Sequence, residues 1–224
     1  MIMDVLHASP ETECFNESDD EAFEGYVLKD VDIVEPLTRR SHAKVAIFKC
    51  ILSSQHAAKL LELHPNGRVV WMFRRYEDVV NSNLARFPRH FEELHDMLYD
   101  PVRAGWRLEN VTPDDMALVR KFYDKRADDA SARALIWFLR NQLLFQQNLD
   151  RDPRVLLVNY DHLVSDPDGN LEKVFKFLGI EYRPEFAGDV HNQSIRKSKP
   201  CSFDPEVKEL CDGMFERLAA LPHV

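Results

Sequence analysis

The stretch from residue 68 to residue 84 constrains the fold more than any other part of the chain. Five apolar residues, Val69–Phe73, predict a buried strand, and Arg74 and Arg75 follow at its end. Ser82 comes eight residues after Arg74, inside a predicted helix. Ligands of open α/β sheets bind beyond the carboxyl ends of the strands, so this pattern predicts an anion clamp made of Arg74 and Ser82. The alternative is that Arg74 is simply solvated.

Two further strands are predicted on either side of this stretch. Residues 44–48 indicate a buried strand that ends in Lys49, and a helix capped by Ser53 or Ser54 connects it to the strand at 69–73. This β-α-β order predicts a right-handed crossover and a parallel sheet. The strands at 44–48 and 69–73 are then expected to be neighbours, with Lys49 and Arg74 along one edge of the sheet.

A third buried strand, 154–160, ends in Tyr160. Helices are predicted near the amino terminus, from Pro113 to about Gln147 as one helix or as two broken near Asp128, and at 171–178 and 205–221. The sequence thus predicts an α/β fold, a three-layer sandwich with a mostly parallel sheet, and one domain that spans residues 1–224.

Composition excludes several classes of function. The net charge of −9 and the pI near 5.5 argue against nucleic-acid binding, which normally needs a basic surface. Four scattered cysteines form no C-x-x-C pair, so neither a zinc site nor a disulfide framework is indicated. The apolar runs are too short to span a membrane, and we expect a soluble, cytoplasmic protein.

Two loops have strongly one-sided charge. Residues 11–24 contain seven acids, including Glu17, and no base. Residues 191–200 contain three bases, among them Arg196 and Lys197, and no acid. Both loops are compatible with ordinary solvated segments, but the basic loop also has the composition of a phosphate lid.

These segments, taken in order, resemble the sulfotransferases that use 3′-phosphoadenosine 5′-phosphosulfate (PAPS). The phrase from Phe73 to Ser82 is similar to the motif of that family that holds the 3′-phosphate. Asn159-Tyr160-Asp-His-Leu163, followed by Asp166-Pro167, resembles its tyrosine–acid–leucine segment. Ser194-Ile-Arg196-Lys197 is similar to its Arg-Lys-Gly loop, with Ser198 in place of the glycine.

The resemblance implies a role for each of these residues. Arg74 and Ser82 would bind the 3′-phosphate, Tyr160 would lie near the adenine, and Arg196 with Lys197 would bind the nucleotide phosphates. In the position of Lys49, these enzymes often place a lysine that faces the transferred sulfuryl group. Glu17 matches the place of a carboxylate base that removes the proton of the acceptor. PAPS would be the co-substrate, and no metal is required.

The resemblance also implies a first strand and a Ser/Thr/Gly-rich 5′-phosphosulfate loop before Met1-Ile-Met, and we expect both to be missing from the chain. An inactive relative that binds nucleotide or a protein partner is therefore the alternative to an active sulfotransferase. A P-loop kinase fits the predicted sheet, but the chain contains no G-x-x-x-x-G-K-[ST] motif. Sugar, lipid, phenol and peptide acceptors are all compatible, and Phe87, Tyr123 and Trp137 either line an acceptor pocket or pack in the core.

Overall fold

The computed structural model describes residues 1–86, 91–123, 128–188 and 201–224. In its first half the elements are α1 (Ile2–His7), β1 (Thr12–Phe15), β2 (Phe23–Glu24), β3 (Val27–Leu28), α2 (Val31–Arg40), β4 (Val45–Phe48), η1 (Ile51–His56), α3 (Ala57–Leu63), β5 (Val69–Phe73), α4 (Tyr76–Arg86) and α5 (Phe91–Tyr99). The second half contains α6 (Pro101–Ala104), η2 (Gly105–Leu108), α7 (Pro113–Tyr123), α8 (Asp129–Gln146), η3 (Leu149–Arg151), β6 (Val155–Asn159), α9 (Tyr160–Ser165), α10 (Pro167–Leu178), η4 (Pro184–Ala187) and α11 (Pro205–Ala219).

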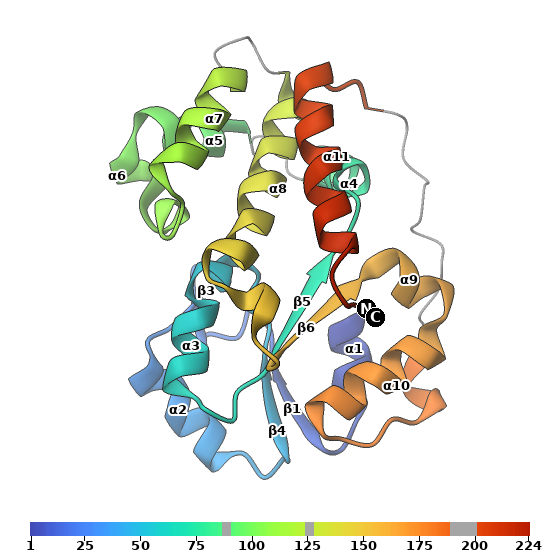
Figure 1. Cartoon of the computed structure of the whole chain (residues 1–224). Helices are drawn as coiled ribbons and strands as arrows, with labels where there is room; N and C mark the ends of the chain where they lie inside the picture. The colour runs from blue at the N-terminus through green and yellow to red at the C-terminus, as the bar shows by residue number, and fades with distance from the viewer. Residues whose placement is uncertain (87–90, 124–127, 189–200) are drawn as a thin grey trace.

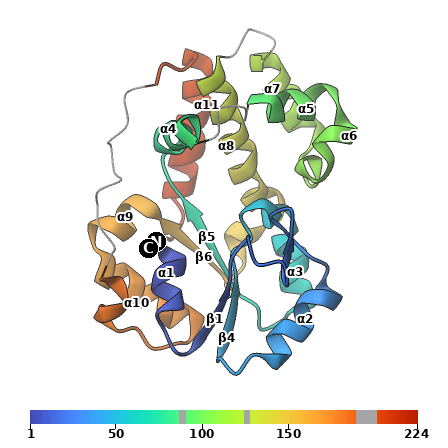
Figure 2. The ribbon, with the colours of Figure 1, turned by 180° about the vertical axis from the view of Figure 1, so that it is seen from behind.

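The strands form pairs (Figures 1 and 2). β1 pairs with β4 and β5 pairs with β6, both in parallel, whereas β2 and β3 form a short antiparallel pair. The predicted parallel pairing is present, but the expectation that β4 and β5 are direct neighbours is wrong. The backbone of β5 bonds instead to β6, which returns from far along the chain, because a helical crossover does not require its two strands to be adjacent.

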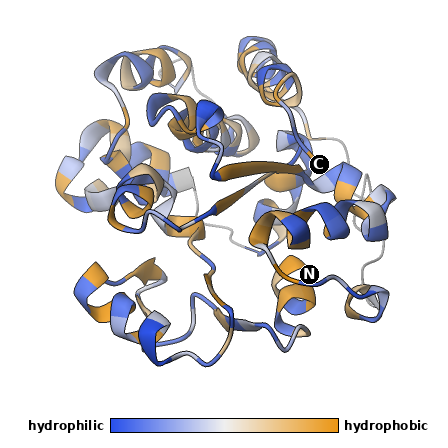
Figure 3. Cartoon of the chain, turned by 60° about the horizontal axis from the view of Figure 1, so that its bottom comes forward, coloured by the Kyte–Doolittle hydropathy of each residue, from blue (hydrophilic) through white to orange (hydrophobic). Residues whose placement is uncertain are grey.

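The side chains of β5 alternate between two cores, which shows that helices cover both faces of this strand. Trp71 and Phe73 pack in a core built on α8, α4 and α11, while Val70 and Met72 pack in a second core with α1 and α10. A strand that is buried on both faces reads as a continuous apolar run, as Val69–Phe73 does. In Figure 3 the central strands are largely hydrophobic, whereas the helices carry both kinds of residue. This arrangement confirms the three-layer α/β fold.

The second core also joins the two parallel strand pairs. Cys14 of β1 and Ile47 of β4 pack in it together with Val158 of β6. One layer of helices, α1 and α10, therefore serves both pairs.

Local signals explain several helix ends. Asp166 caps α10, Pro167 is its first residue, and Gly179 closes it in the left-handed conformation, at a φ of 77°. Of the two predictions for residues 113–147, the broken helix is correct, since Asp128 is extended and caps α8, which begins at Asp129. In the described part of the chain no helix is both long and apolar enough to cross a membrane.

Candidate functional site

The register of β5 and β6 brings Arg74 and Tyr160 together. Phe73 is the partner of Asn159 at the last position of the pair, so the next residue of each strand emerges at the same edge. The guanidinium carbon of Arg74 lies 4.5 Å from the centre of the Tyr160 ring. An arginine stacked on an aromatic ring has a fixed plane, which suits the recognition of a phosphate by a planar fork of N–H donors.

Two carboxylates lie near the guanidinium group of Arg74. Its Nη2 lies 3.3 Å from Asp78 Oδ2, and its Nε lies 3.8 Å from Asp161 Oδ1. Both distances exceed the 2.7–2.9 Å that is typical of a tight charge-assisted bond. Neither acid was predicted from the sequence as a site residue. The spacing of four residues between Arg74 and Asp78, typical of an ion pair at a helix start, is the signal that could have found the first.

Tyr76 fixes the start of α4 and hence the position of Arg74. Its ring is completely buried against Trp137 and Phe203, and its hydroxyl donates to Asp212 Oδ1 of α11 over 3.1 Å. Burial, helped by Glu77 and Asp212, raises the pKa of this phenol well above its usual range. Tyr76 is therefore an uncharged anchor two residues from the arginine. Sequence reasoning missed it because an aromatic residue in a helix carries no distinguishing signal.

The other residues predicted for the nucleotide site are Ser82, Arg196 and Lys197. Ser82 is exposed on α4, one helical turn beyond Asp78 and therefore on the same face of the helix. Arg196 and Lys197 lie outside the described residues.

The second pair of parallel strands brings Lys49 and Glu17 together. Lys49 follows β4 and Glu17 follows β1, and the backbone N–H of Lys49 donates to the carbonyl of Phe15 over 3.0 Å. Lys49 Nζ lies 3.3 Å from Glu17 Oε2. The Glu17 side chain is 15% exposed and that of Lys49 is 37% exposed, so solvent and a substrate can still reach the pair.

Cys50 lies next to this ion pair, but its thiol is not reactive at neutral pH. Burial, and then the negative charge of Glu17, raise the pKa of its thiol to about 12. The thiolate is the nucleophilic form of cysteine, and at neutral pH this thiol stays protonated. The reactive groups of this edge are therefore the ammonium group and the carboxylate.

Of the three aromatic residues considered for an acceptor pocket, Trp137 is buried in the core and Phe87 lies outside the described residues. Tyr123 is half-buried and belongs to a cluster with His95 and Tyr99, in which the His95–Tyr123 and Tyr99–Tyr123 ring centres are 6.2 and 6.1 Å apart. For Trp137 the core reading is correct.

The site thus has two parts, each at the carboxyl ends of a parallel strand pair. One part is a guanidinium stacked on an aromatic ring, and the other is an ammonium group paired with a carboxylate. Cations at strand ends can bind and stabilise a phosphorylated or sulfated anion, while a carboxylate can accept a proton.

Comparisons with known proteins agree with the α/β fold. A sulfotransferase from Alicyclobacillus acidocaldarius has a similar structure, with a TM-score of 0.53 and 12% identity over 97% of this chain and 86% of that one. The sulfotransferase domain from the curacin biosynthetic pathway gives a TM-score of 0.50 and 12% identity, over 82% of this chain and 67% of that one. A comparison with curated proteins gave no match. The family model described as "Sulfotransferase family" matches residues 4–184, and the chain belongs to that family.

Proposed function

We propose that this protein transfers a sulfuryl group from PAPS to a hydroxyl or amine acceptor. The observation that carries this proposal is the pair formed by Lys49 and Glu17, with 3.3 Å between Nζ and Oε2, at the carboxyl ends of β4 and β1. Sulfuryl transfer needs a cation for the charge of the leaving group and a base for the acceptor. The pair supplies both groups in one place.

Arg74, Ser82 and Tyr160 hold the nucleotide end of the donor in this proposal. The side chain of Arg74 is 18% exposed, and its ion pairs with Asp78 and Asp161 are longer than tight bonds. A 3′-phosphate would approach the same guanidinium edge, with the Ser82 hydroxyl further along the face of α4. Tyr160 would keep the guanidinium plane fixed while the phosphate binds. Arg196 and Lys197 are proposed to bind the remaining nucleotide phosphates.

The proposed reaction at the Lys49–Glu17 pair exchanges one bond to sulfur for another. The acceptor oxygen or nitrogen forms a bond to sulfur while the bond from sulfur to the bridging phosphate oxygen breaks. Lys49 stabilises the negative charge that develops on that bridging oxygen. Glu17 takes the proton that the acceptor loses, and 3′-phosphoadenosine 5′-phosphate leaves.

Nucleotide binding and turnover are tested separately. Adding 3′-phosphoadenosine 5′-phosphate at millimolar concentration is expected to raise the melting temperature, because a ligand that prefers the native state stabilises it. Transfer is then measured as release of this nucleotide from PAPS in the presence of pooled phenol, sugar, lipid and peptide acceptors. No thermal shift in a folded protein would contradict the whole proposal, whereas binding without transfer would favour an inactive, nucleotide-binding relative.

The base is tested by Glu17→Gln. We expect this variant to lose about 10²–10⁴-fold in turnover, the usual contribution of a general base, while its affinity for the nucleotide product is unchanged. Glu24→Gln is the matched control, because Glu24 is an exposed acid of the same acidic segment, residues 11–24. Full activity of Glu17→Gln would remove this carboxylate from the mechanism.

A further inference from the structure

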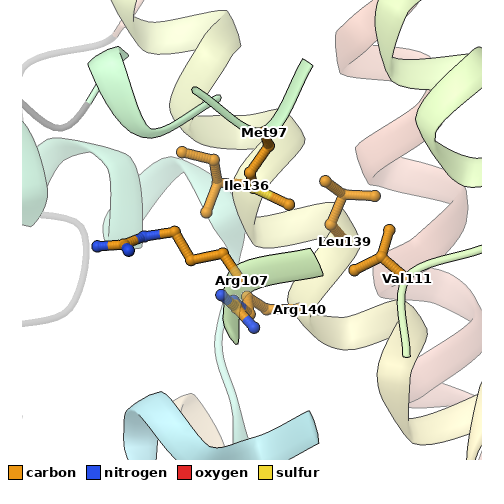
Figure 4. A pocket seen from close by; sticks show the side chains of 6 residues that line it. All are labelled: Met97, Arg107, Val111, Ile136, Leu139 and Arg140. Atoms are coloured by element: carbon orange, nitrogen blue, oxygen red, sulfur yellow. The ribbon is translucent and has the colours of Figure 1, made fainter. Parts of the chain in front are cut away.

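Two arginines converge on one tryptophan, on a part of the molecule that the proposed donor site does not use. The guanidinium carbon of Arg107 lies 4.7 Å from the centre of a Trp106 ring, and that of Arg140 lies 4.9 Å away. Trp106 and Arg107 belong to η2, and Arg140 belongs to α8. The two arginines also line a narrow recess, shown in Figure 4 with its other lining residues, Met97, Val111, Ile136 and Leu139.

Among the described residues, the positive charges at this place outnumber the negative ones. Arg107 Nε donates to Glu93 Oε1 over 2.5 Å. Arg140 Nη1 is buried and has no hydrogen-bond partner among the described residues. Burial lowers the pKa of Arg140, Arg107 lowers it further, and Glu93 offsets only part of this effect. Two guanidinium groups thus share one carboxylate, in a setting where an uncompensated buried cation costs stability.

A bound anionic ligand would supply the second negative charge and offset this cost in stability. A planar guanidinium binds the oxygens of a carboxylate or of a sulfate ester through parallel N–H bonds. Arg107 and Arg140 are both partly buried, so each residue keeps some surface exposed to solvent. The recess itself is too narrow for a water molecule, which places an anion at its mouth, against the two guanidinium groups.

The location of this cluster relates it to the acceptor rather than to the nucleotide. Just after η2, Glu109 contacts His56, and Asn110 Nδ2 donates to the carbonyl of Gln55 over 2.6 Å. His56 and Gln55 end η1, the element that begins two residues after Lys49. The cluster is therefore connected through η1 to the lysine side of the site, whereas Arg74 and Tyr160 belong to the other strand pair.

We propose that Arg107 and Arg140 form an anion site that binds a carboxylate or sulfate-ester group of the acceptor. The assignment to the acceptor rests on the proposed function; the anion site itself rests on the two guanidinium groups and on Trp106. The protein would then prefer anionic acceptors to neutral ones of the same shape.

Binding is measured first, without PAPS, on the full chain carrying Arg74→Ala, so that the proposed phosphate site does not contribute. The probes are inorganic sulfate and benzoate, each compared with chloride at equal ionic strength, and the readouts are tryptophan fluorescence and melting temperature. We expect both probes to raise the melting temperature. Adding Arg140→Met should raise the dissociation constant for benzoate about tenfold or more, the range for a lost charge-assisted bond.

The same variants separate an anion site from a merely structural stack. In chloride, Arg140→Met should melt at the same temperature as its parent or higher, because it removes the excess positive charge. Arg217→Met is the matched control, since Arg217 of α11 also stacks on an aromatic ring, that of Phe145. The control should keep the full response to both probes.

Three results would overturn the proposal. One is a lower melting temperature of Arg140→Met in chloride with an unchanged response to benzoate, which is the behaviour of a structural residue. Another is an equal response of all variants to sulfate and none to benzoate, which is general salting-out. The third is an active enzyme that does not discriminate 4-hydroxybenzoate from phenol. Absence of nucleotide binding together with a normal benzoate response would instead refute the proposed function and leave the anion site standing.

Discussion

The rings of Phe15 and Phe48 stack face to face, with centres 4.8 Å apart and planes 7° apart, at the last pair of β1 and β4. Lys49 is the residue directly after Phe48, and Glu17 comes two residues after Phe15. The stack therefore fixes the point at which both strands leave the core. It places the ammonium group and the carboxylate of the proposed catalytic pair on the same edge.

Lys49→Met is expected to reduce turnover about 10²–10³-fold, the loss seen when one group that stabilises transition-state charge is removed. Affinity for 3′-phosphoadenosine 5′-phosphate should fall by a smaller factor, because the bridging oxygen that Lys49 is proposed to face stays on this product. Initial rates with PAPS and calorimetric titration of the product measure the two effects. Lys44→Met is the control: Lys44 precedes the same strand and pairs with Glu11 at the opposite end. Equal losses in both variants would mean that Lys49 has only a general electrostatic role.

The adjacent arginines Arg74 and Arg75 should behave in opposite ways. Arg75 contacts Glu77 and Asp212 and stacks on Phe215, so Arg75→Ala should lower the melting temperature and leave nucleotide affinity nearly unchanged. Arg74→Ala should weaken binding of 3′-phosphoadenosine 5′-phosphate about 10- to 100-fold, as expected for a lost charge-assisted bond. Arg74→Lys should recover little, because a lysine offers neither the planar fork nor the stack on Tyr160. Titration calorimetry of the three variants tests this; unchanged affinity in Arg74→Ala would contradict the assignment.

The strand ends were predictable from sequence because a basic or aromatic residue just after an apolar run marks them locally. Lys49, Arg74 and Tyr160 could therefore be named in advance as residues at strand ends. Which ends meet could not be predicted, since the pairing of β5 with β6 joins residues 86 positions apart in the chain. The same reason explains why the Arg74–Asp161 contact was missed and why β4 was wrongly expected beside β5.

Tyr76 is expected to contribute stability mainly through its ring. Tyr76→Phe loses one hydrogen bond to Asp212, which keeps its contact with Lys208, so the free energy of unfolding should fall by only about 1 kcal/mol. Tyr76→Ala empties a fully buried site and should cost about 3–5 kcal/mol. It should also weaken nucleotide binding, because Arg74 loses its anchor. Urea unfolding and titration calorimetry measure these effects, with Tyr26→Phe at an exposed site as the control. Normal nucleotide affinity in a folded Tyr76→Ala would separate the anchor from the site.

Stability is expected to fall in alkaline solution. Burial raises the pKa of Cys50 from 9.0 to about 12, and burial also raises the pKa values of Cys211 and Tyr76. Above pH 9.0 the unfolded chain releases the Cys50 proton, whereas the native protein retains it until about pH 12. The unfolded state then binds fewer protons than the native state, so the free energy of unfolding decreases as the pH rises. The contribution of Cys50 is complete below pH 9.0 and is lost between there and about pH 12.

Urea unfolding at a series of pH values from neutral upward tests this linkage. Each group whose pKa is raised in the native state makes the free energy of unfolding fall faster, by at most about 1.4 kcal/mol per pH unit. Cys50→Ala and Cys211→Ala should each make the decline shallower, whatever their effect at neutral pH. Leu143→Ala is the control, because it truncates the same core as Cys211 without removing a titrating group and should shift the whole curve in parallel. If the cysteine variants instead decline as steeply as the wild type, then these thiols are ionised in the native protein at much lower pH than their burial implies.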